Sequence, residues 1–490
     1  MHDSDTQASQ DEVINPNDAR FSTRNRLVIS ILIISTFVVI LNETLMIVAI
    51  PQLMVDLGVT AEAAQWLTTA FFLTMSIVIP VTGFLMQRMN TRPVFALAMS
   101  LFSIGTLVCA LAPGLEILIF GRVIQASGTA IMMPLLMTTI MTLVPLQSRG
   151  KFMGNISVVI AMAPALGPAV AGFILSHFTW PWLFWFVLPI ALSALVLGQF
   201  RLINVTTPRY APVDLLSVAL SVIAFGGLVY GLSSLGQVAD VNDSITPVQS
   251  LAIGIFTMML FVWRQLRLQK QDRALLDLRT FSSRNFTISL AMMAVTMGVF
   301  FGALILLPIY MQKVLGLDTQ LIGLIFLPGG VLMGILSPTV GRLFDRYGPT
   351  PLIVPGTLIF SAVMWAMTQL GPETWWGYIL MGHIIIGASL ALVFTPLFTA
   401  SLGSIPPQLY SHGSATLGSI QQLSGAAGVA LLVALMSLNS KLLLESGRSP
   451  VEALSGGITS AFLWAASLSV LAFIAAFFVR KPQDAPTPGH

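Results

Sequence analysis

The chain carries very little charge for its length. Only 9% of its 490 residues are Asp, Glu, Lys or Arg, and 56% are hydrophobic. A soluble domain carries about 25% charged residues. The composition therefore excludes a soluble globular protein and indicates an integral membrane protein with many spans.

Cysteine is also nearly absent, and recognisable catalytic patterns are missing. A single cysteine, Cys109, excludes an intramolecular disulfide framework and a cysteine-based zinc site. The sequence has no G-x-x-x-x-G-K-[ST] loop for nucleotide phosphates, no cluster of metal ligands and no Ser/His/Asp arrangement. We therefore expect neither an enzyme nor a cofactor, and any work that the protein does must draw on an ion gradient.

What the chain has in abundance is apolar stretches of about 20 residues, the length that crosses a bilayer. Fourteen can be placed, so the fold class expected is an all-α integral membrane protein. The stretches are 27–50, 63–86, 94–112, 117–141, 152–176, 182–200, 214–234, 249–267, 286–310, 319–341, 351–370, 375–400, 412–437 and 457–479.

Basic residues are distributed unevenly over the segments between these stretches. Nineteen lie in the terminal segments and in the gaps after even-numbered stretches, whereas the other gaps hold only Lys313, Lys441 and Arg448. Cytoplasmic loops carry the excess of Lys and Arg, so we expect both termini in the cytoplasm and a multi-pass protein of the cytoplasmic (inner) membrane. Such scattered charge is not typical of a nucleic-acid binder.

The chain also repeats itself. The segment GFLMQRMNTRPV (83–94) returns as GRLFDRYGPTPL (341–352), 258 residues later, and Pro51 and Pro308, expected to end their helices, are 257 apart. Parallel repeats of this kind are typical of alternating-access carriers with a site between the halves. The division expected is a disordered cytoplasmic tail (1–26), a six-helix half (27–201), two inserted helices with a basic cytoplasmic loop (202–285), a second six-helix half (286–480) and a cytoplasmic tail (481–490). We expect the inserted pair to be peripheral.

Five motifs in order carry a family resemblance. They are LNETLMIVAIP (41–51), the two repeated segments, GRVIQASGTAIMMP (121–134) and the glycine and alanine spacing of 154–172. Together they resemble the fourteen-helix drug:proton antiporter branch (EmrB/QacA-type) of the major facilitator superfamily, over about residues 27–480. The resemblance implies an exporter of amphipathic or lipophilic drug-like compounds that exchanges them for protons, which would confer multidrug efflux and antibiotic resistance.

Glu43 is the acidic residue placed deepest within an apolar stretch. Inserting a charge there costs on the order of 2.5–3.5 kcal/mol, and such residues usually face a bundle interior or a wet cavity. Ser35 and Thr36 lie about two turns earlier on the same side as Asn42 and Glu43. Glu43 is therefore the expected proton site, with a permanently protonated, structural carboxyl as the alternative. In the related branch the acid stands at the position of Asn42, one residue and about 100° away.

Two basic side chains accompany Glu43 within the spans. The resemblance makes Arg122 a coupling element that responds to the proton site, and the alternative is that it caps carbonyls and holds helices together. His383 occupies the corresponding place in the second half. It is either a second proton carrier or a neutral histidine in the core.

The repeated segments place polar residues at the cytoplasmic ends of two helices. The resemblance implies a latch there, and the alternative is that the arginines only set topology. Asp345 keeps the acid of this motif, whereas the first half has Gln87 instead and loses a charge-assisted hydrogen bond. The latch residues expected are Gly83, Gln87, Arg88, Gly341, Asp345 and Arg346.

The fifth stretch matches the antiporter signature through Gly154, Pro164, Gly167, Pro168 and Gly172. Small residues allow close helix approach, and proline frees backbone carbonyls and bends a helix. We expect this helix to pack against the opposite half and to rock without opening a leak. Tight helix packing without such a role is the alternative.

A substrate cavity is expected between the halves. Gln421 and Gln422 would supply polar contacts, and Met46, Trp66 and Phe71 an adaptable apolar surface. The partners expected are a small amphipathic molecule, protons and membrane lipids, with the protein a monomer and the need for an envelope conduit left open. The rival functions are a dedicated exporter or flippase of one lipid, siderophore or metabolite, and a membrane receptor that does not transport.

Overall fold

A computed structural model of the protein describes residues 23–205, 208, 214–235 and 246–482. Within these ranges, fourteen helices are long and apolar enough to cross a membrane. Their bounds are α1 (Thr23–Leu57), α2 (Ala61–Arg88), α3 (Thr91–Ala110), α4 (Leu115–Leu143), α5 (Arg149–His177), α6 (Pro181–Arg201), α7 (Leu215–Leu235), α8 (Pro247–Leu268), α9 (Arg284–Lys313), α10 (Thr319–Tyr347), α11 (Thr350–Met367), α12 (Trp376–Gly403), α13 (Tyr410–Glu445) and α14 (Pro450–Ala476). Short 3₁₀ helices are η1 (Leu146–Ser148), η2 (Gln269–Gln271), η3 (Leu278–Ser282) and η4 (Pro407–Leu409).

The fourteen expected spans are confirmed, because hydropathy and length fix a membrane helix almost alone. The ends of two helices differ from the expectation. Pro51 and Pro308 lie inside α1 and α9 instead of ending them, since transmembrane helices tolerate proline where neighbours satisfy the freed carbonyls. Of the two expected tails, residues 1–22 and 483–490 lie outside the described residues.

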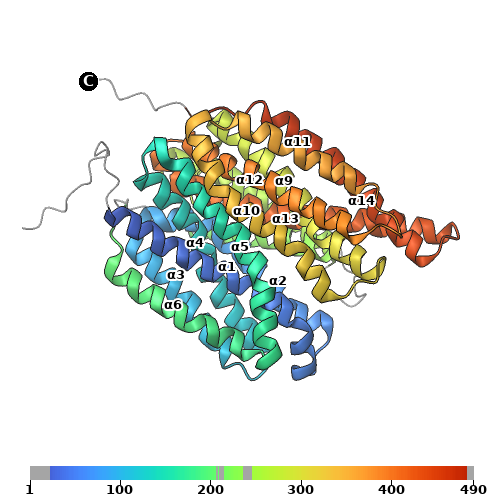
Figure 1. Ribbon diagram of the computed structural model, residues 1–490. Coiled ribbons are helices and arrows are strands. Elements are labelled where there is room, and N and C mark those ends of the chain that lie inside the picture. The colour runs from blue at the N-terminus through green and yellow to red at the C-terminus, as the bar shows by residue number, and fades with distance from the viewer. Residues whose placement is uncertain (1–22, 206–207, 209–213, 236–245, 483–490) are drawn as a thin grey trace, which may run out of the picture.

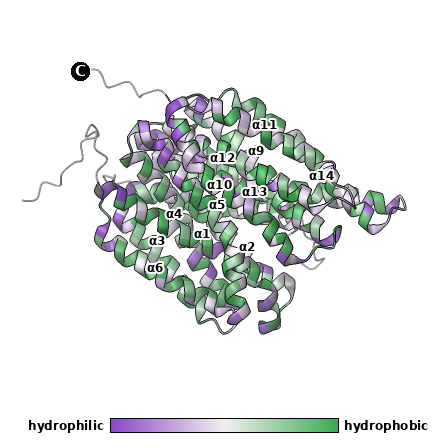
Figure 2. Ribbon diagram, viewed as in Figure 1, coloured by the Kyte–Doolittle hydropathy of each residue, from purple (hydrophilic) through white to green (hydrophobic). Residues whose placement is uncertain are grey.

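The helices form two groups that follow the internal repeat. In the first half α5 packs against α1, and α4 against α2 and α3; in the second half α13 packs against α9 and α14, and α11 against α12. Helix α1 begins and helix α14 ends on the same side of the bundle (Figure 1), which we call the terminal face. Figure 2 shows the helix middles largely hydrophobic and hydrophilic residues gathered at helix ends, densely at the terminal face.

The halves meet along two helix pairs related by the repeat. The more extensive contact is between α5 and α10, and the other is between α2 and α13. Small residues line the first pair: Gly150 meets Gly341, Gly154 meets the backbone at Ser337, and Gly330 meets Ala165. This close approach begins at the terminal face and continues well into the membrane.

The inserted helices differ in their placement. Helix α8 packs on α7, and α7 packs on both α2 and α13, so α7 covers one of the two joints between the halves. A Cβ on Gly226 of α7 would lie 3.4 Å from Cδ1 of Ile77 in α2. Of the two helices expected to be peripheral, α7 therefore contacts both halves along this joint, whereas α8 packs mainly on α7.

Candidate functional site

Arg122 is the centre of a buried polar cluster in the first half. Its side chain is fully buried on α4. Nη1 donates to Oδ1 of Asn42 at 3.3 Å and to Oε1 of Gln125 at 2.7 Å, and Nε2 of Gln125 donates to Oγ1 of Thr106 at 2.7 Å. The guanidinium lies 4.0 Å from the ring centroid of Phe71. Side chains from α1, α2, α3 and α4 thus hold one cation in place.

This cluster has unused hydrogen-bonding capacity. Nε and Nη2 of Arg122 find no partner among the described residues, and neither do the buried hydroxyls of Ser35 and Thr36 on α1. Buried donors without partners are costly, on the order of 1–3 kcal/mol each. The site is therefore suited to receive a further acceptor, such as a carboxylate or water.

Glu43 lies beside this cluster without being bonded into it. Its side chain is half-buried on α1 and within electrostatic reach of Arg122. The carboxylate makes no hydrogen bond within the part of the chain that the structure describes. Asn42, at the position where the related branch has an acid, is 2% exposed and accepts the bond from Arg122. The one-residue displacement therefore separates two roles: the amide binds the arginine, and the acid stays unbonded.

Helix α5, which carries the expected antiporter signature, lies between α1 of its own half and α10 of the other. Gly167 lies so close to Thr44 of α1 that any Cβ would overlap the threonine hydroxyl. On the facing side, a Cβ on Gly154 would lie 2.5 Å from the carbonyl oxygen of Ser337. Gly154 thus makes the expected close contact with the opposite half, whereas Gly167 packs against α1 of its own half. Gly172, in contrast, has open space around it, and Pro164 and Pro168 are exposed.

His383 lies on α12 in the second half, packed against α10. Its ring contacts Phe326 edge-on, with 4.5 Å between ring centroids, and it fills the space left by Gly329. Neither ring nitrogen has a hydrogen-bond partner among the described residues. Both its reading as a proton carrier and its reading as a core histidine remain predictions.

At the terminal face, Asp345 of α10 joins the two halves. One carboxylate oxygen accepts the backbone N–H of Gly150 at 2.7 Å, and the other accepts that of Lys151 at 2.9 Å. These are unpaired donors of the first turn of α5, where a negative charge is stabilised. Gly341, one turn earlier, lies directly against the carbonyl of Gly150. Arg346 stacks over Tyr347 at 5.1 Å.

The corresponding joint in the first half has a different chemistry. Nε2 of Gln87 donates to the carbonyl oxygen of Gln408 at 3.3 Å. Gly83, one turn earlier on α2, lies against His412 of α13, where a Cβ would be 3.1 Å from Nδ1. Arg88 is in the last turn of α2. The two joints therefore share their register, but only the Asp345 joint includes an acid from its own motif.

Three more polar contacts across the halves escaped sequence reasoning. Nη1 of Arg149 donates to the hydroxyl of Tyr410 at 3.1 Å, while its Nη2 caps the carbonyl of Met141 at 2.8 Å. Hydroxyl pairs join Thr138 to Ser414 at 3.1 Å and Thr395 to Ser157 at 2.7 Å. No spacing in the sequence pairs residues that lie more than 230 positions apart, so only the fold could reveal them.

The residues expected to line a substrate cavity are spread over different environments. Met46 is 1% exposed and Phe71 is fully buried beneath Arg122, so neither faces an open cavity in this structure. Trp66 stacks on Tyr230 of α7, with 6.1 Å between ring centroids. Gln421 and Gln422 are half-buried on α13, and Nε2 of Gln422 lies 3.8 Å from Sδ of Met75. The assignment of these five residues to a substrate cavity stays a prediction.

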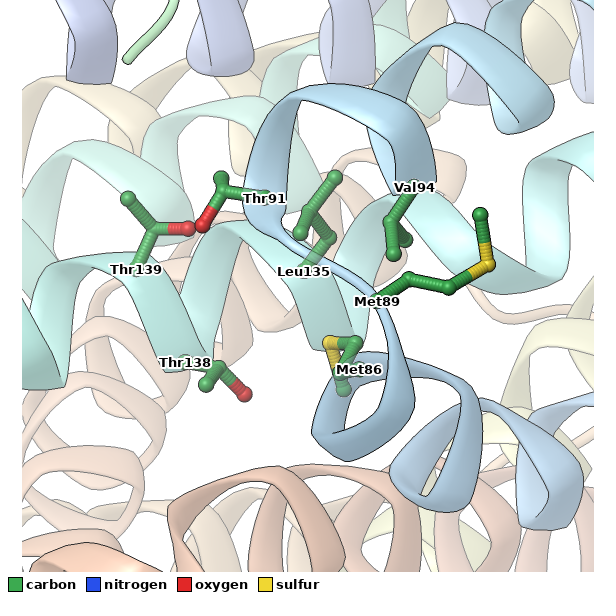
Figure 3. Close-up of a pocket in the computed structure, with 7 residues that line it drawn as sticks. All are labelled: Met86, Met89, Thr91, Val94, Leu135, Thr138 and Thr139. Atoms are coloured by element: carbon green, nitrogen blue, oxygen red, sulfur yellow. The ribbon is translucent and has the colours of Figure 1, made fainter. Parts of the chain in front are cut away.

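A small cavity lies near the terminal face, among α2, α3 and α4. Figure 3 shows its lining side chains converging from these helices: Met86, Met89, Thr91, Val94, Leu135, Thr138 and Thr139. Its volume of about 10 Å³ has room for about one water molecule. It is therefore too small to be a site for a drug-sized substrate.

The sequence matches the Major Facilitator Superfamily over residues 32–429. It is 38% identical over 458 residues to the uncharacterized MFS-type transporter YcnB of Bacillus subtilis, covering 93% of this chain and 95% of that protein. It is 36% identical over 461 residues to the lincomycin resistance protein LmrB of Listeria monocytogenes, with 93% and 97% covered. The multidrug export protein EmrB of Haemophilus influenzae is 26% identical over 401 residues, with 81% and 78% covered.

Two solved structures share the fold. The human organic anion transporter MFSD10 aligns with a TM-score of 0.64 at 15% identity, covering 92% of this chain and 99% of that one. The proton:xylose symporter XylE aligns with a TM-score of 0.64 at 16% identity, covering 94% and 97%.

Proposed function

Because this chain belongs to the Major Facilitator Superfamily, a family of membrane transporters, we propose that it is a proton-coupled exporter of amphipathic, drug-like compounds. It is a multi-pass membrane protein with fourteen membrane-spanning helices in its described part. Support for a drug-like substrate comes from relatives, since two of them are named for lincomycin resistance and for multidrug export. The substrate itself would be small and amphipathic, taken from the cytoplasm or the inner leaflet.

The observation that carries proton coupling is the geometry at Arg122. Its Nη1 is held by Asn42 and Gln125, while Nε and Nη2 are without partners and Glu43 lies unbonded nearby. A charged Glu43 is attracted to these free donors, whereas a protonated Glu43 is not. Loading and releasing one proton would thus change the attraction between α1 and α4, and this change is the coupling step that we propose.

Orientation follows from the distribution of charge. We place the terminal face in the cytoplasm, because nineteen basic residues lie in the terminal segments and in the sequence gaps after even-numbered spans, and cytoplasmic segments carry the excess of Lys and Arg. The polar contacts across the halves at Asp345, Gln87 and Arg149 lie at this face. The structure would then be the state closed to the cytoplasm, in which Glu43 exchanges protons with the outside and substrate is released there.

The proposal is tested by two measurements on purified protein. Reconstituted into vesicles with the terminal face outward and an acidic interior, the protein should accumulate several unrelated lipophilic cations or antibiotics. Accumulation of one compound class alone would identify a dedicated exporter instead. Substrate added to weakly buffered, detergent-solubilised protein should release protons, and the absence of both signals would contradict a transport function driven by protons.

A further inference from the structure

The segment between α8 and α9 packs against both halves of the protein at the terminal face. Leu275 and Leu276 are buried in a cluster with Phe84 of α2 and Ala415 of α13. The same cluster contains Phe225 of α7 and Phe261 of α8. A segment that belongs to neither half is therefore built into the joint between α2 and α13.

Buried polar contacts hold this segment in place. The backbone N–H groups of Leu275 and Leu276 both donate to Oε1 of Gln265, at 2.8 and 3.3 Å. Gln265 is fully buried on α8, and its Nε2 donates to Oγ of Ser217 on α7 at 2.8 Å. Asp277 therefore follows directly after a stretch of backbone that is held in place.

Asp277 is a buried carboxylate that directly follows Leu276, a member of the same buried cluster as Ala415 of α13. It is 3% exposed, and it accepts the backbone N–H and the guanidinium of Arg279, which also pairs with the exposed Asp272. The Asp272 side chain is 70% exposed, so Asp277 is the carboxylate of this group that is held inside the joint. On the facing element, His412 lies within electrostatic reach of Asp277 and Arg279. Gly83 of α2 also lies against His412.

The equivalent position in the second half shows what a carboxylate does here. Asp345 binds the first turn of α5, and α5 corresponds to α13 in the repeat. In the first half the motif has Gln87, which donates to a carbonyl and brings no negative charge to the first turn of α13. His412 in that turn is nevertheless within electrostatic reach of a buried carboxylate, Asp277, which comes from the inserted segment.

We propose that Asp277 is a positioning residue of the terminal-face latch and takes the electrostatic role of the acid that is missing at position 87. The inference rests on the proposed alternating-access function, since a latch has meaning only if the terminal face opens. Removing the charge of Asp277 takes an anion away from a helix N-terminus, so the closed state loses about two- to fivefold in population relative to the open state. An acid restored at position 87 reverses this loss.

The test measures the opening of the terminal face directly. In full-length protein with Cys109→Ala, spin labels at Gln147→Cys (η1) and Pro407→Cys (η4) report the distance between the halves in detergent and in lipid. Both positions are exposed. Asp277→Asn should shift the distances toward longer values, and Asp272→Asn, the matched control on the same arginine, should leave them unchanged.

The rescue variant separates latch chemistry from local folding. Asp277→Asn combined with Gln87→Glu should return the distribution toward that of the parent protein. A shift without rescue means that Asp277 only holds its own segment together, and no shift at all means that it plays no part in the latch; both results overturn the proposal. If Asp277→Asn alone does not fold, recovery of folded protein by Gln87→Glu becomes the test, and failure of the double variant overturns it. None of these readouts depends on proton coupling or transport, so they remain interpretable if the proposed function is wrong.

Discussion

The amide oxygen of Asn42 lies 3.3 Å from Nη1 of Arg122, at the position where the related antiporter branch has an acid. Glu43, the neighbouring residue, is half-buried and remains outside this contact. An amide cannot change its charge, so Asn42 holds the arginine whatever the protonation of the site. Asn42 therefore binds the arginine and Glu43 is left to change its charge, two roles that a single acid would combine.

Moving the acid back by one residue should preserve part of the coupling. In Asn42→Asp combined with Glu43→Gln, the new carboxylate replaces the amide beside Arg122. We expect substrate-induced proton release to be weaker than in the parent protein but above that of Glu43→Gln alone. If the double variant releases no more protons than the single one, coupling requires an acid at position 43 itself.

Arg122→Lys should lower proton-driven transport by about tenfold or more. Lysine keeps the charge, but it loses the planar fork that reaches Asn42 and Gln125 and the stacking on Phe71, a contact worth about 2 kcal/mol when desolvated. Initial rates in vesicles measure the effect, with the exposed Arg342→Lys as the control at a surface position. Unchanged rates in Arg122→Lys would show that charge alone matters at this site.

Gly341→Ala should prevent full closure of the terminal face. A Cβ there overlaps the carbonyl oxygen of Gly150, a backbone atom that cannot rotate away. Overpacking of this kind costs about 1–3 kcal/mol, and only in the closed state. The label pair on η1 and η4 should report longer distances, whereas Gly172→Ala, which meets no atom within 4 Å, should not change them. Closed distances in Gly341→Ala would contradict the described contact of α5 with α10.

The ion pair between Asp214 and Arg264, at the base of the inserted helices, should stabilise the protein and lose this effect at acid pH. The side-chain hydrogen bond from Arg264, followed by that from Ser217, lowers the pKa of Asp214 from its ordinary value of 3.8 to about 2. A carboxylate with a lowered folded-state pKa stabilises the protein above its unfolded value and loses this contribution as the pH falls toward 2. Asp214→Asn should therefore reduce the free energy of unfolding by on the order of 1–2 kcal/mol near neutral pH.

The difference between Asp214→Asn and the parent protein should shrink between about pH 4 and pH 2. Thermal unfolding in detergent, followed by intrinsic fluorescence over this range, measures it. A difference that is constant with pH would show that the ion pair with Arg264, at 2.6 Å, is not responsible for the loss.

Much of the architecture follows from local sequence. Hydropathy predicts the fourteen spans, and the repeated segments predict where Asp345 and Gln87 lie at helix ends. Contacts such as Arg149 with Tyr410 cannot be predicted in this way, because each depends on how two distant helices are rotated against each other. Phe71 shows the same limit: its position on α2 was evident, but its contact with Arg122 required the fold.

The central claim is that Glu43 carries the coupled proton, and Glu43→Gln tests it most directly. Glutamine keeps the shape and the hydrogen-bonding groups but cannot change its charge. In vesicles with an imposed pH gradient, the variant should still exchange substrate down its own gradient and should lose pH-driven accumulation. Full proton-driven accumulation by Glu43→Gln would contradict the account, make the carboxylate structural and require another carrier such as His383.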